Sequence, residues 1–549
     1  MRGLHALAIG LVLAVGGGMQ VDASAADPAW SEAAAVPGMT FNQYCARATG
    51  DGIQIGSYPS SSIYPQPSLS VGRESSGDWE PERSAPFPVC SSTYLTDADG
   101  LTTAIVATGN GFGLATQLPD HSWGPAIVPQ ALTSCYVDSD RSPNALIARD
   151  GTLVVACSHA TTQTKIVEQS PTGAWTTTIY GAGRLRAELS IARGRAGSVE
   201  AFWEEADAFT IDAYRATRDA TGAWGPPTRL FEWKTLWQTP GLVPPALATN
   251  ASGEGVAVFS ANESDIVPRT YTADITGAWT SQPTLDALNN HSGPVRNVGA
   301  DDTGTLTIAT EGPGADPLIR RTRGGTITTT PFTGSAWSFA ALPTGEVVLI
   351  HPASLVSYGP LDVDLLENGE WLPTHRLPTS NAVTLPAILV GPEHDIVITY
   401  PASNTGPADA RTWWTARLVS QPRLVALTMP GSVQAGHDVA VRVTPRQFGA
   451  ALTAVWDFGD GSPSVTGNAV HHSFATAGDF TVRVSTTSPN GRSASESRVM
   501  HVDEQACDAD TCLPATASET GACKGALIGE TVAVGSRCNV DARSASPSR

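Results

Sequence analysis

Aromatic and acidic residues occur together at several places in the first half of the chain. The densest group is the run Trp203, Glu204 and Glu205, which Asp207 follows closely. An aromatic ring can stack on the apolar face of a sugar ring while carboxylates accept hydrogen bonds from its hydroxyl groups. The candidate ligand-binding residues of this kind are Trp203, Glu204, Glu205, Asp207, Trp233, Trp237, Glu263 and Asp265. In the structural alternative, the tryptophans pack between sheets and the acids are solvated.

The common signatures of catalysis are absent. The sequence contains no HExxH, GxSxG, P-loop or CxxC motif, so the usual metal, nucleophile and nucleotide sites are not indicated. We therefore predict no catalytic residue. A glycosidase that uses two carboxylates needs them at a fixed separation across a pocket, and separate parts of a fold could supply that arrangement.

A repeat defines the elements that would carry these residues. The phrase TGAW ends at Trp175, Trp224 and Trp279, about 50 residues apart, which is the period of propeller blades. Four short strands separated by turn clusters precede or include each tryptophan, as in a β-propeller blade. Seven units over residues 77–423 are predicted to begin near Cys90, Asn144, Ala187, Pro245, Val295, Ala336 and Pro386.

The two ends of the repeat region are expected to pair. The seventh unit lacks its own outer strand, whereas an isolated G-x-W strand surrounds Trp79, after an N-terminal extension at 26–76. We predict that residues 77–86 complete the last blade and close the ring. Loops after each second strand and loops entering each first strand then share one face, and they hold the candidate residues listed above.

The repeated turn resembles a known motif. Asp219 and Asp274 lie five residues before Trp224 and Trp279, which resembles a degenerate Asp-box of sialidase-like and BNR-type propellers. The glycine stands two rather than three residues before the tryptophan, and the leading serine is missing. A sialidase also needs an Arg-Ile-Pro-like element, which this sequence lacks.

Residues 424–503 resemble a PKD domain, an immunoglobulin-like β-sandwich. Trp456 to Gly461 read WDFGDG, the family's signature, and His472, Phe474, Gly478, Phe480 and Val482 fit its second half. The resemblance implies a spacer or an accessory module in an exported bacterial protein. No cofactor is predicted, with Asp457 and Asp460 as weak calcium candidates, because carboxylates in a tight turn more often accept bonds from backbone amides.

The N-terminus and the charge indicate a secreted protein. Residues 1–25 have the basic, apolar and A-x-A-like regions of a signal peptide. No later segment has the roughly 20 apolar residues of a membrane-spanning helix. The formal charge of −19 disfavours nucleic acid and anionic membranes as partners. We expect a soluble extracellular monomer, released rather than tethered.

The eight cysteines form two groups of four. Disulfides are expected in an exported chain. Cys135 and Cys157 are predicted to lie on one face of the second blade and to pair, which leaves Cys45 and Cys90 to fasten the N-terminal extension. Pairing within the tail at 504–549 stays open among Cys507, Cys512, Cys523 and Cys538.

These features favour a secreted, non-catalytic binding or adhesion protein. Its propeller face would contact an extracellular glycan or another protein, with the PKD module as a spacer. The alternative is a divergent carbohydrate-active enzyme, an exo-glycosidase or a lyase, with its site in the propeller's central depression.

Overall fold

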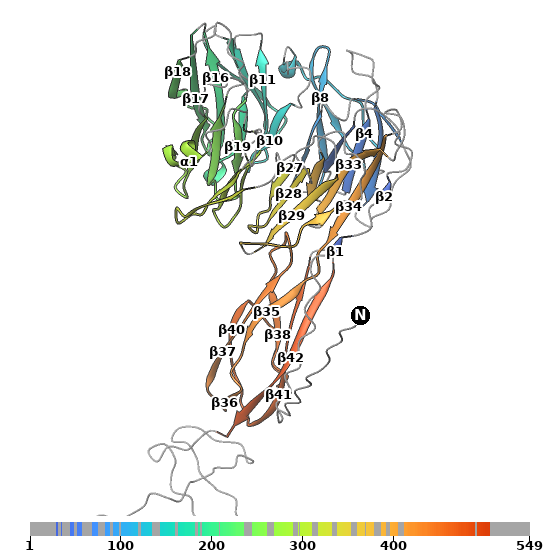
Figure 1. The fold of residues 1–549 in the computed structure, drawn as a ribbon, viewed down its shortest axis with the longest axis vertical. Helices are drawn as coiled ribbons and strands as arrows, with labels where there is room; N and C mark the ends of the chain where they lie inside the picture. Colours follow the sequence, from blue (N-terminus) through green and yellow to red (C-terminus); the bar gives the residue numbers. More distant parts are fainter. Residues whose placement is uncertain are drawn as a thin grey trace, which may run out of the picture.

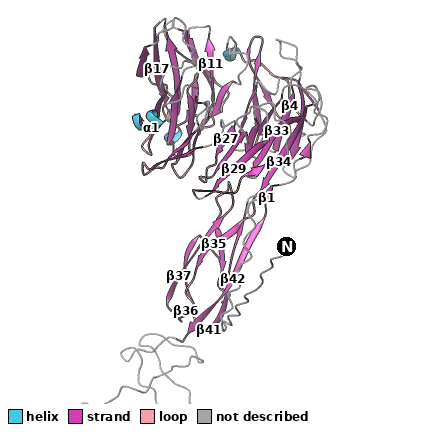
Figure 2. Ribbon diagram, viewed as in Figure 1, coloured by secondary structure: helices cyan, strands magenta, loops and turns pink. Residues whose placement is uncertain are grey.

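The computed structural model describes most of residues 83–504, with gaps in loops, and the backbone of short strands between residues 29 and 74. The predicted signal peptide and residues 505–549 lie outside the described residues. β-Strands provide nearly all of the regular structure (Figure 2). The predicted all-β fold class is confirmed, with a propeller-like region followed by a β-sandwich (Figure 1).

Eight small antiparallel sheets form the propeller-like region in the described residues. The N-terminal sheet comprises β3 (Tyr44–Ala48), β4 (Gly52–Ser57), β5 (Ser68–Glu74) and β6 (Arg83–Ala85). Sheet 1 comprises β7 (Ser92–Thr96), β8 (Thr102–Thr108) and β9 (Gly111–Thr116). Sheet 2 comprises β10 (Asn144–Ile147), β11 (Leu153–His159), β12 (Gln163–Gln169) and β13 (Trp175–Tyr180). Sheet 3 comprises β14 (Leu185–Arg186), β15 (Ser190–Arg193), β16 (Val199–Ala206), β17 (Thr210–Arg218) and β18 (Thr228–Lys234).

The remaining sheets of this region follow the same plan. Sheet 4 comprises β19 (Ala246–Thr249), β20 (Gly255–Phe259), β21 (Arg269–Ala273) and β22 (Trp279–Ser281), after which comes helix α1 (Pro283–Leu288). Sheet 5 comprises β23 (Asn297–Ala300), β24 (Leu306–Ala309), β25 (Pro317–Arg321) and β26 (Ile327–Pro331). Sheet 6 comprises β27 (Ser338–Ala341), β28 (Val347–Pro352), β29 (Leu361–Glu367), β30 (Glu370–Trp371) and β31 (His375–Arg376). Sheet 7 comprises β32 (Ala387–Val390), β33 (Ile396–Ser403) and β34 (Arg411–Val419), together with β1 (Ala29–Trp30) and β2 (Ala34–Ala35).

The sheets succeed one another through their first strands. Contacts run from β7 to β10, β15, β19, β23, β27 and β32 in turn, and from β32 to β3. Each seam between neighbouring sheets is filled by buried apolar side chains, as between sheets 6 and 7. This is the order expected of propeller blades, in which each sheet buries its faces against its two neighbours.

Two predictions about this region are wrong in detail. Seven units were predicted, but the N-terminal extension forms a further sheet, so the described residues contain eight. Residues 77–86 were predicted to close the last blade, yet β6 pairs with β5 in its own sheet. The outer edge of β34 is instead paired with β1 and β2. The G-x-W phrase at Trp79 lies outside the described residues. Strands β3, β4 and β5 precede it in the chain, and none of them contains a TGAW phrase.

The repeated turns depend on glycine. In the turns that precede Trp175, Trp224 and Trp279, the glycine has a φ of +85°, +92° and +83° respectively, a conformation that other residues resist. Trp224 donates a hydrogen bond from Nε1 to the Glu168 carboxylate of the preceding sheet. The tryptophans therefore join neighbouring sheets.

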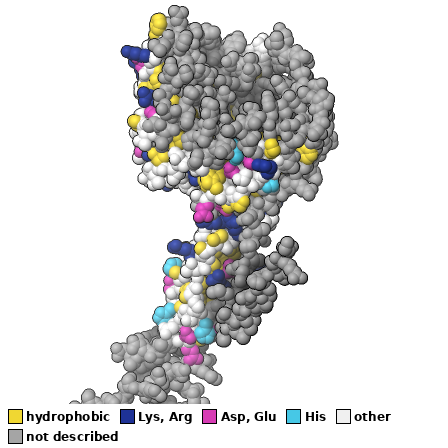
Figure 3. Space-filling model, in the orientation of Figure 1, with side chains coloured by type: hydrophobic (Ala, Val, Ile, Leu, Met, Phe, Trp, Pro, Cys, Tyr) yellow, Lys and Arg dark blue, Asp and Glu magenta, His cyan; other side chains and the backbone are white. Residues whose placement is uncertain are grey.

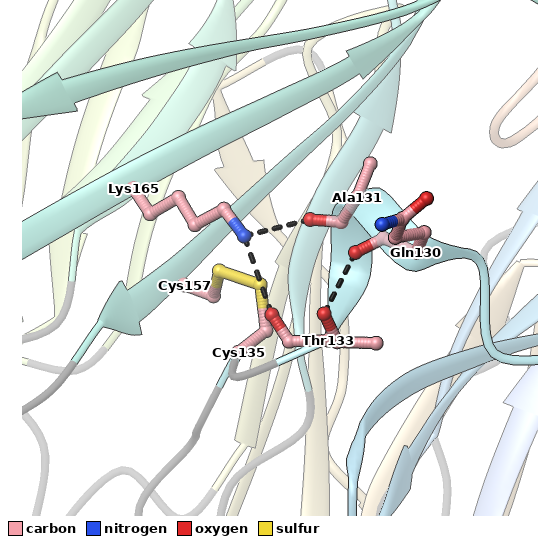
Figure 4. Close-up of a disulfide and its surroundings, with 6 residues drawn as sticks. All are labelled: Gln130, Ala131, Thr133, Cys135, Cys157 and Lys165. Carbon is pink, nitrogen blue, oxygen red and sulfur yellow. Dashed lines mark hydrogen bonds between the residues drawn. A yellow bond between two sulfur atoms is a disulfide. The ribbon is translucent and has the colours of Figure 1, made fainter.

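The predicted disulfide between Cys135 and Cys157 is present (Figure 4). Beside it, Lys165 donates hydrogen bonds from Nζ to the carbonyls of Ala131 at 2.7 Å and Thr133 at 3.3 Å. Burial lowers the pKa of Lys165. The bridge and the lysine together attach the segment after sheet 1 to sheet 2. The predicted partners of the other cysteines lie outside the described residues or have no described side chain.

The C-terminal module is a sandwich of two sheets. One contains β35 (Arg423–Thr428), β37 (Asp438–Arg446) and β40 (Ala469–Ser473). The other contains β36 (Ser432–Gln434), β42 (Ser493–Asp503), β41 (Gly478–Thr487), β38 (Ala454–Asp457) and β39 (Val465–Thr466). Trp456 is fully buried between them and donates from Nε1 to the Gly467 carbonyl. The predicted immunoglobulin-like module is therefore confirmed.

The two parts of the molecule are joined by more than the chain. Phe448 of the sandwich is 1% exposed and belongs to the apolar cluster of sheets 6 and 7. Ser420, between β34 and β35, accepts bonds at its carbonyl from Gln447 and Arg492 and at Oγ from the Phe448 amide. Arg423 forms an ion pair with Glu367 of β29. Acidic and basic side chains meet at this neck in Figure 3.

Candidate binding site on the third sheet

Strand β16 carries three of the predicted site residues, Trp203, Glu204 and Glu205, and all eight residues of the strand are buried. Successive side chains of a strand point to opposite faces. Trp203 therefore lies in the cluster shared with sheet 2, whereas Phe202 lies in the cluster shared with sheet 4. By the same alternation Glu205 faces sheet 2 and Glu204 faces sheet 4.

Trp203 is a core residue. It has no exposed surface and stacks between Tyr180 at 5.3 Å and Tyr214 at 5.6 Å between ring centroids. Its Nε1 donates to Glu205 Oε1 at 2.9 Å. Trp233 is only 7% exposed and packs in the cluster shared with sheet 4. Both rings are placed where a ligand could not stack on them, so the structural alternative holds for these two.

Glu204 occupies an apolar environment. Its side chain has no exposed surface, and neither carboxylate oxygen has a hydrogen-bond partner. Its cross-strand neighbour Ala213 belongs to the cluster of Phe202, Phe259 and Tyr271. Burial raises the pKa of Glu204 well above its ordinary value. A neutral acid here cannot reach a ligand on the surface, so Glu204 does not fit the predicted binding role.

The other face of sheet 3 carries a row of carboxylates. Glu205 lies opposite Asp212, which lies opposite Glu232. Residues 229 and 232 would point to opposite faces of a regular strand, but the register shifts between Ala213 and Tyr214. This bulge brings Arg229 to the face of the acids, where it forms ion pairs with Asp212 at 2.5 Å and with Glu232.

The turn between β16 and β17 presents an exposed aromatic ring three residues before Asp212 in the chain. The β16–β17 turn is closed by Asp207, whose Oδ1 accepts bonds from the amides of Phe209 and Thr210. Phe209, at the tip of this turn, is 59% exposed. Asp207 therefore acts by shaping the turn that presents Phe209. Trp237, Glu263 and Asp265 lie outside the described residues.

Exposure differs along this acidic row and makes its outer end accessible. The side chain of Asp212 is 7% exposed, that of Glu232 37% and that of Arg229 46%. Figure 3 shows basic, acidic and hydrophobic side chains along the edge where Figure 1 places β18. We define the sheet 3 patch as Phe209, Asp212, Arg229 and Glu232. It offers a ring face, hydrogen-bond acceptors and a guanidinium within one sheet.

Sequence reasoning missed all four residues of this patch. It identified the nearby Glu205 and Asp207 but not Phe209, Asp212, Arg229 or Glu232. The segments TIDAYRATR and TRLFEWK contain charged residues within strands, but these stand mostly three residues apart and do not follow the period of two that indicates a half-polar sheet face. Which of these residues meet across strands depends on the bulge, which has no clear signature in the sequence.

The weak calcium candidates are engaged in the sandwich itself. Asp457 Oδ1 accepts a bond from the Gly459 amide, and Asp460 Oδ1 accepts one from the Ser462 amide. Asp460 Oδ2 lies 2.8 Å from His472 Nε2. Burial alone would raise the pKa of Asp460, but the hydrogen bonds from Ser462 and His472 lower it to about 2. Within the described part of the chain, no group of three or more His, Cys, Asp or Glu side chains could hold a metal ion.

One protein family matches part of the chain. The model of the PKD domain matches residues 424–500, which confirms the predicted module. No curated protein is similar enough in sequence to serve as a relative. Over the described residues, no helix has the length and apolarity needed to cross a membrane.

Several solved structures share a distant likeness. A virginiamycin B lyase from Staphylococcus aureus is 13% identical, with 60% of this chain and 96% of that chain covered at a TM-score of 0.34. A protein from Lactobacillus plantarum is 13% identical, with 60% and 96% covered at a TM-score of 0.37. The polysaccharide lyase Uly1 is 8% identical, with 69% and 100% covered at a TM-score of 0.36. At such identities and TM-scores the likeness carries no argument about activity.

Proposed function

We propose that this chain is an extracellular, non-catalytic binding protein whose propeller-like region contacts a glycan or a protein through the sheet 3 patch. The observation that carries the proposal is Phe209, which is 59% exposed in the β16–β17 turn, on the sheet whose face carries Asp212, Glu232 and Arg229. An exposed phenyl ring beside acceptors and a guanidinium suits a sugar ring, which has one apolar face and a rim of hydroxyl groups.

An extracellular location is supported by two features. The Cys135–Cys157 disulfide persists most readily in an oxidising compartment. The PKD module is also typical of exported proteins. We propose that the chain is exported, acts as a monomer, and uses this module as a spacer.

An enzyme remains the second candidate, and Glu204 bears on it. A general acid requires a raised pKa and must also reach the substrate. Glu204 has the raised pKa but lies sealed between sheets 3 and 4. Its position therefore gives the enzyme hypothesis no support. Assays of sugar hydrolysis and elimination test for a catalytic site elsewhere in the propeller-like region.

The test combines a glycan array with hydrolysis and elimination assays on the same sugars. We expect retention of a glycan that the Phe209→Ala variant weakens about 10-fold, the loss of roughly one stacking contact. Ile275→Ala is the matched control, because Ile275 is 52% exposed in the turn between β21 and β22, at the other end of the sheets. Turnover of a sugar without retention, or equal weakening by both variants, would contradict the proposal.

A further inference from the structure

Three arginines gather in the turns at the end of the sheets opposite Phe209. Arg149 lies in the turn between β10 and β11, Arg193 is the last residue of β15, and Arg195 lies in the turn that follows it. All three side chains are exposed. Strand β16 separates them from Phe209 by its whole length, about 25 Å for eight residues.

Each guanidinium donates a hydrogen bond to a backbone carbonyl of another sheet. Arg193 Nε donates to the Ile147 carbonyl at 2.7 Å, Arg149 Nη2 to Ala251 at 2.5 Å and Arg195 Nη1 to Thr276 at 3.3 Å. The turns that they connect belong to sheets 2, 3 and 4. Since a guanidinium has five N–H donors, each arginine keeps unused donors while its position is held.

The turns are in close contact, so the three arginines start from neighbouring turns at one end of the sheets. A Cβ on Gly253 would lie 2.4 Å from the Arg195 backbone nitrogen, and a Cβ on Gly197 would lie 3.7 Å from the Arg149 Cβ. The turn from Arg195 to Gly197 has positive φ at both Ala196 and Gly197. We call Arg149, Arg193 and Arg195 the turn-face arginines.

Their charge is not neutralised by carboxylates. Other described arginines form ion pairs, for example Arg215 with Glu200, Arg323 with Glu254 and Arg376 with Asp362. The turn-face arginines form none in the part of the chain that the structure describes, and carbonyl bonds are their polar contacts. In a chain with a formal charge of −19, three unpaired cations at one place are unusual.

The nearby acids are already used. Asp150 forms its ion pair with Arg218. Asp302 accepts a bond from the Ala251 amide, and Asp274 accepts bonds from Thr276 and Ala278 in its own turn. These carboxylates stabilise the turns and leave the guanidiniums to solvent.

We propose that the turn-face arginines bind an oxyanion, the carboxylate or sulfate groups of an acidic polysaccharide. Guanidinium groups bind such anions through charge-assisted and often bidentate hydrogen bonds. Three guanidinium groups in adjacent turns can contact several charged groups of a polymer, whereas a single ion would contact fewer of them. The carboxylates of Asp150, Asp274 and Asp302 lie in these or adjoining turns, so an anion must contact the guanidiniums directly for the attraction to exceed the repulsion.

The site is distinct from the sheet 3 patch and does not depend on it. The test titrates the full chain at low ionic strength with polygalacturonate, chondroitin sulfate, sodium sulfate and a neutral galactan, measured by calorimetry. We expect the charged polymers to bind, the neutral polymer not to bind at this site, and added salt to weaken binding. Binding of sodium sulfate as tightly as of the polymers would assign the site to free oxyanions and would contradict a polymer site.

Variants separate binding from a structural role. The triple variant Arg149→Gln, Arg193→Gln, Arg195→Gln is expected to lose affinity at least about 10-fold, whereas the triple Lys variant keeps much of it because the charge remains. Arg498→Gln is the control, an exposed arginine paired with Glu496 in the sandwich. Phe209→Ala should leave anion binding unchanged. Unaltered affinity in the Gln variant, or no binding of any charged probe to the wild type, would overturn the proposal and leave the arginines as links between turns.

Discussion

Replacing Glu204 is expected to stabilise the protein at neutral pH. A buried polar group without a hydrogen-bond partner costs about 1–3 kcal/mol, and both oxygens of Glu204 lack a partner. Glu204→Met removes the polar group at similar volume, a change that usually costs less than about 1.5 kcal/mol in packing. The two effects together predict a gain of up to about 3 kcal/mol in the free energy of unfolding.

The same residue predicts how stability depends on pH. The pKa of Glu204 is raised in the folded state by burial, so the folded state holds a proton that the unfolded state releases above about pH 4.3. The contribution of Glu204 to stability is therefore complete below that pH and is lost as the pH rises toward the folded pKa. The loss is about 1.4 kcal/mol for each pH unit over this interval.

Urea denaturation at several pH values, followed by tryptophan fluorescence, measures this effect. Glu204→Gln keeps the shape but cannot ionise, so its stability should fall less steeply with pH than that of the wild type. Glu200→Gln is the matched control on the same strand, because Glu200 is buried but paired with Arg215 and Thr217. It should destabilise the protein near neutral pH. Identical pH profiles for the wild type and Glu204→Gln would refute the reasoning.

Three further changes test the packing. Phe448→Ala should lower the free energy of unfolding by about 3–5 kcal/mol and broaden the distribution of shapes seen by X-ray scattering. Val499→Ala should do neither, because Val499 is exposed. Loss of the Cys135–Cys157 bridge, which spans 22 residues, should cost about 3 kcal/mol in thermal denaturation; an unchanged melting temperature would contradict this. Gly253→Ala should destabilise more than Gly173→Ala, because both have positive φ but a Cβ at Gly173 meets nothing within 4 Å.

The repeat in the sequence predicted the sheets that contain a recognisable turn. Trp175, Trp224 and Trp279 mark sheets 2, 3 and 4, since each indole packs on a neighbouring sheet after a glycine turn. The N-terminal sheet was missed because its strands β3 to β5 precede the G-x-W strand without any such phrase. The prediction of the strand that pairs with the edge of β34 was wrong for a related reason, because the strands that pair there, β1 and β2, are only two residues long each. Strands that short leave no periodic pattern to detect.

The candidate site was harder to predict than the fold. Trp203, Glu204 and Glu205 are adjacent in sequence, but the pleat sends Glu204 to the opposite seam from the other two. An aromatic residue beside an acid therefore indicated a ligand site where the structure has a core ring and a neutral acid. Phe209 looked like one more apolar residue, and only the turn closed by Asp207 shows that it faces solvent.

The joint at Phe448 decides which end of the propeller-like region is free. Glu367 and Glu346 of sheet 6 lie at the end of the strands that also carries the turn-face arginines, and Arg423 of the sandwich pairs with Glu367 there. Burial raises the pKa of Glu346, next to this pair. Because the sandwich is fixed by a buried ring and not only by residues 420–422, it directs the opposite end, with Phe209, away from itself. The PKD module therefore leaves uncovered the end of the propeller-like region at which a glycan would contact the sheet 3 patch. An acidic polymer bound to the turn-face arginines would lie on the same side as the module.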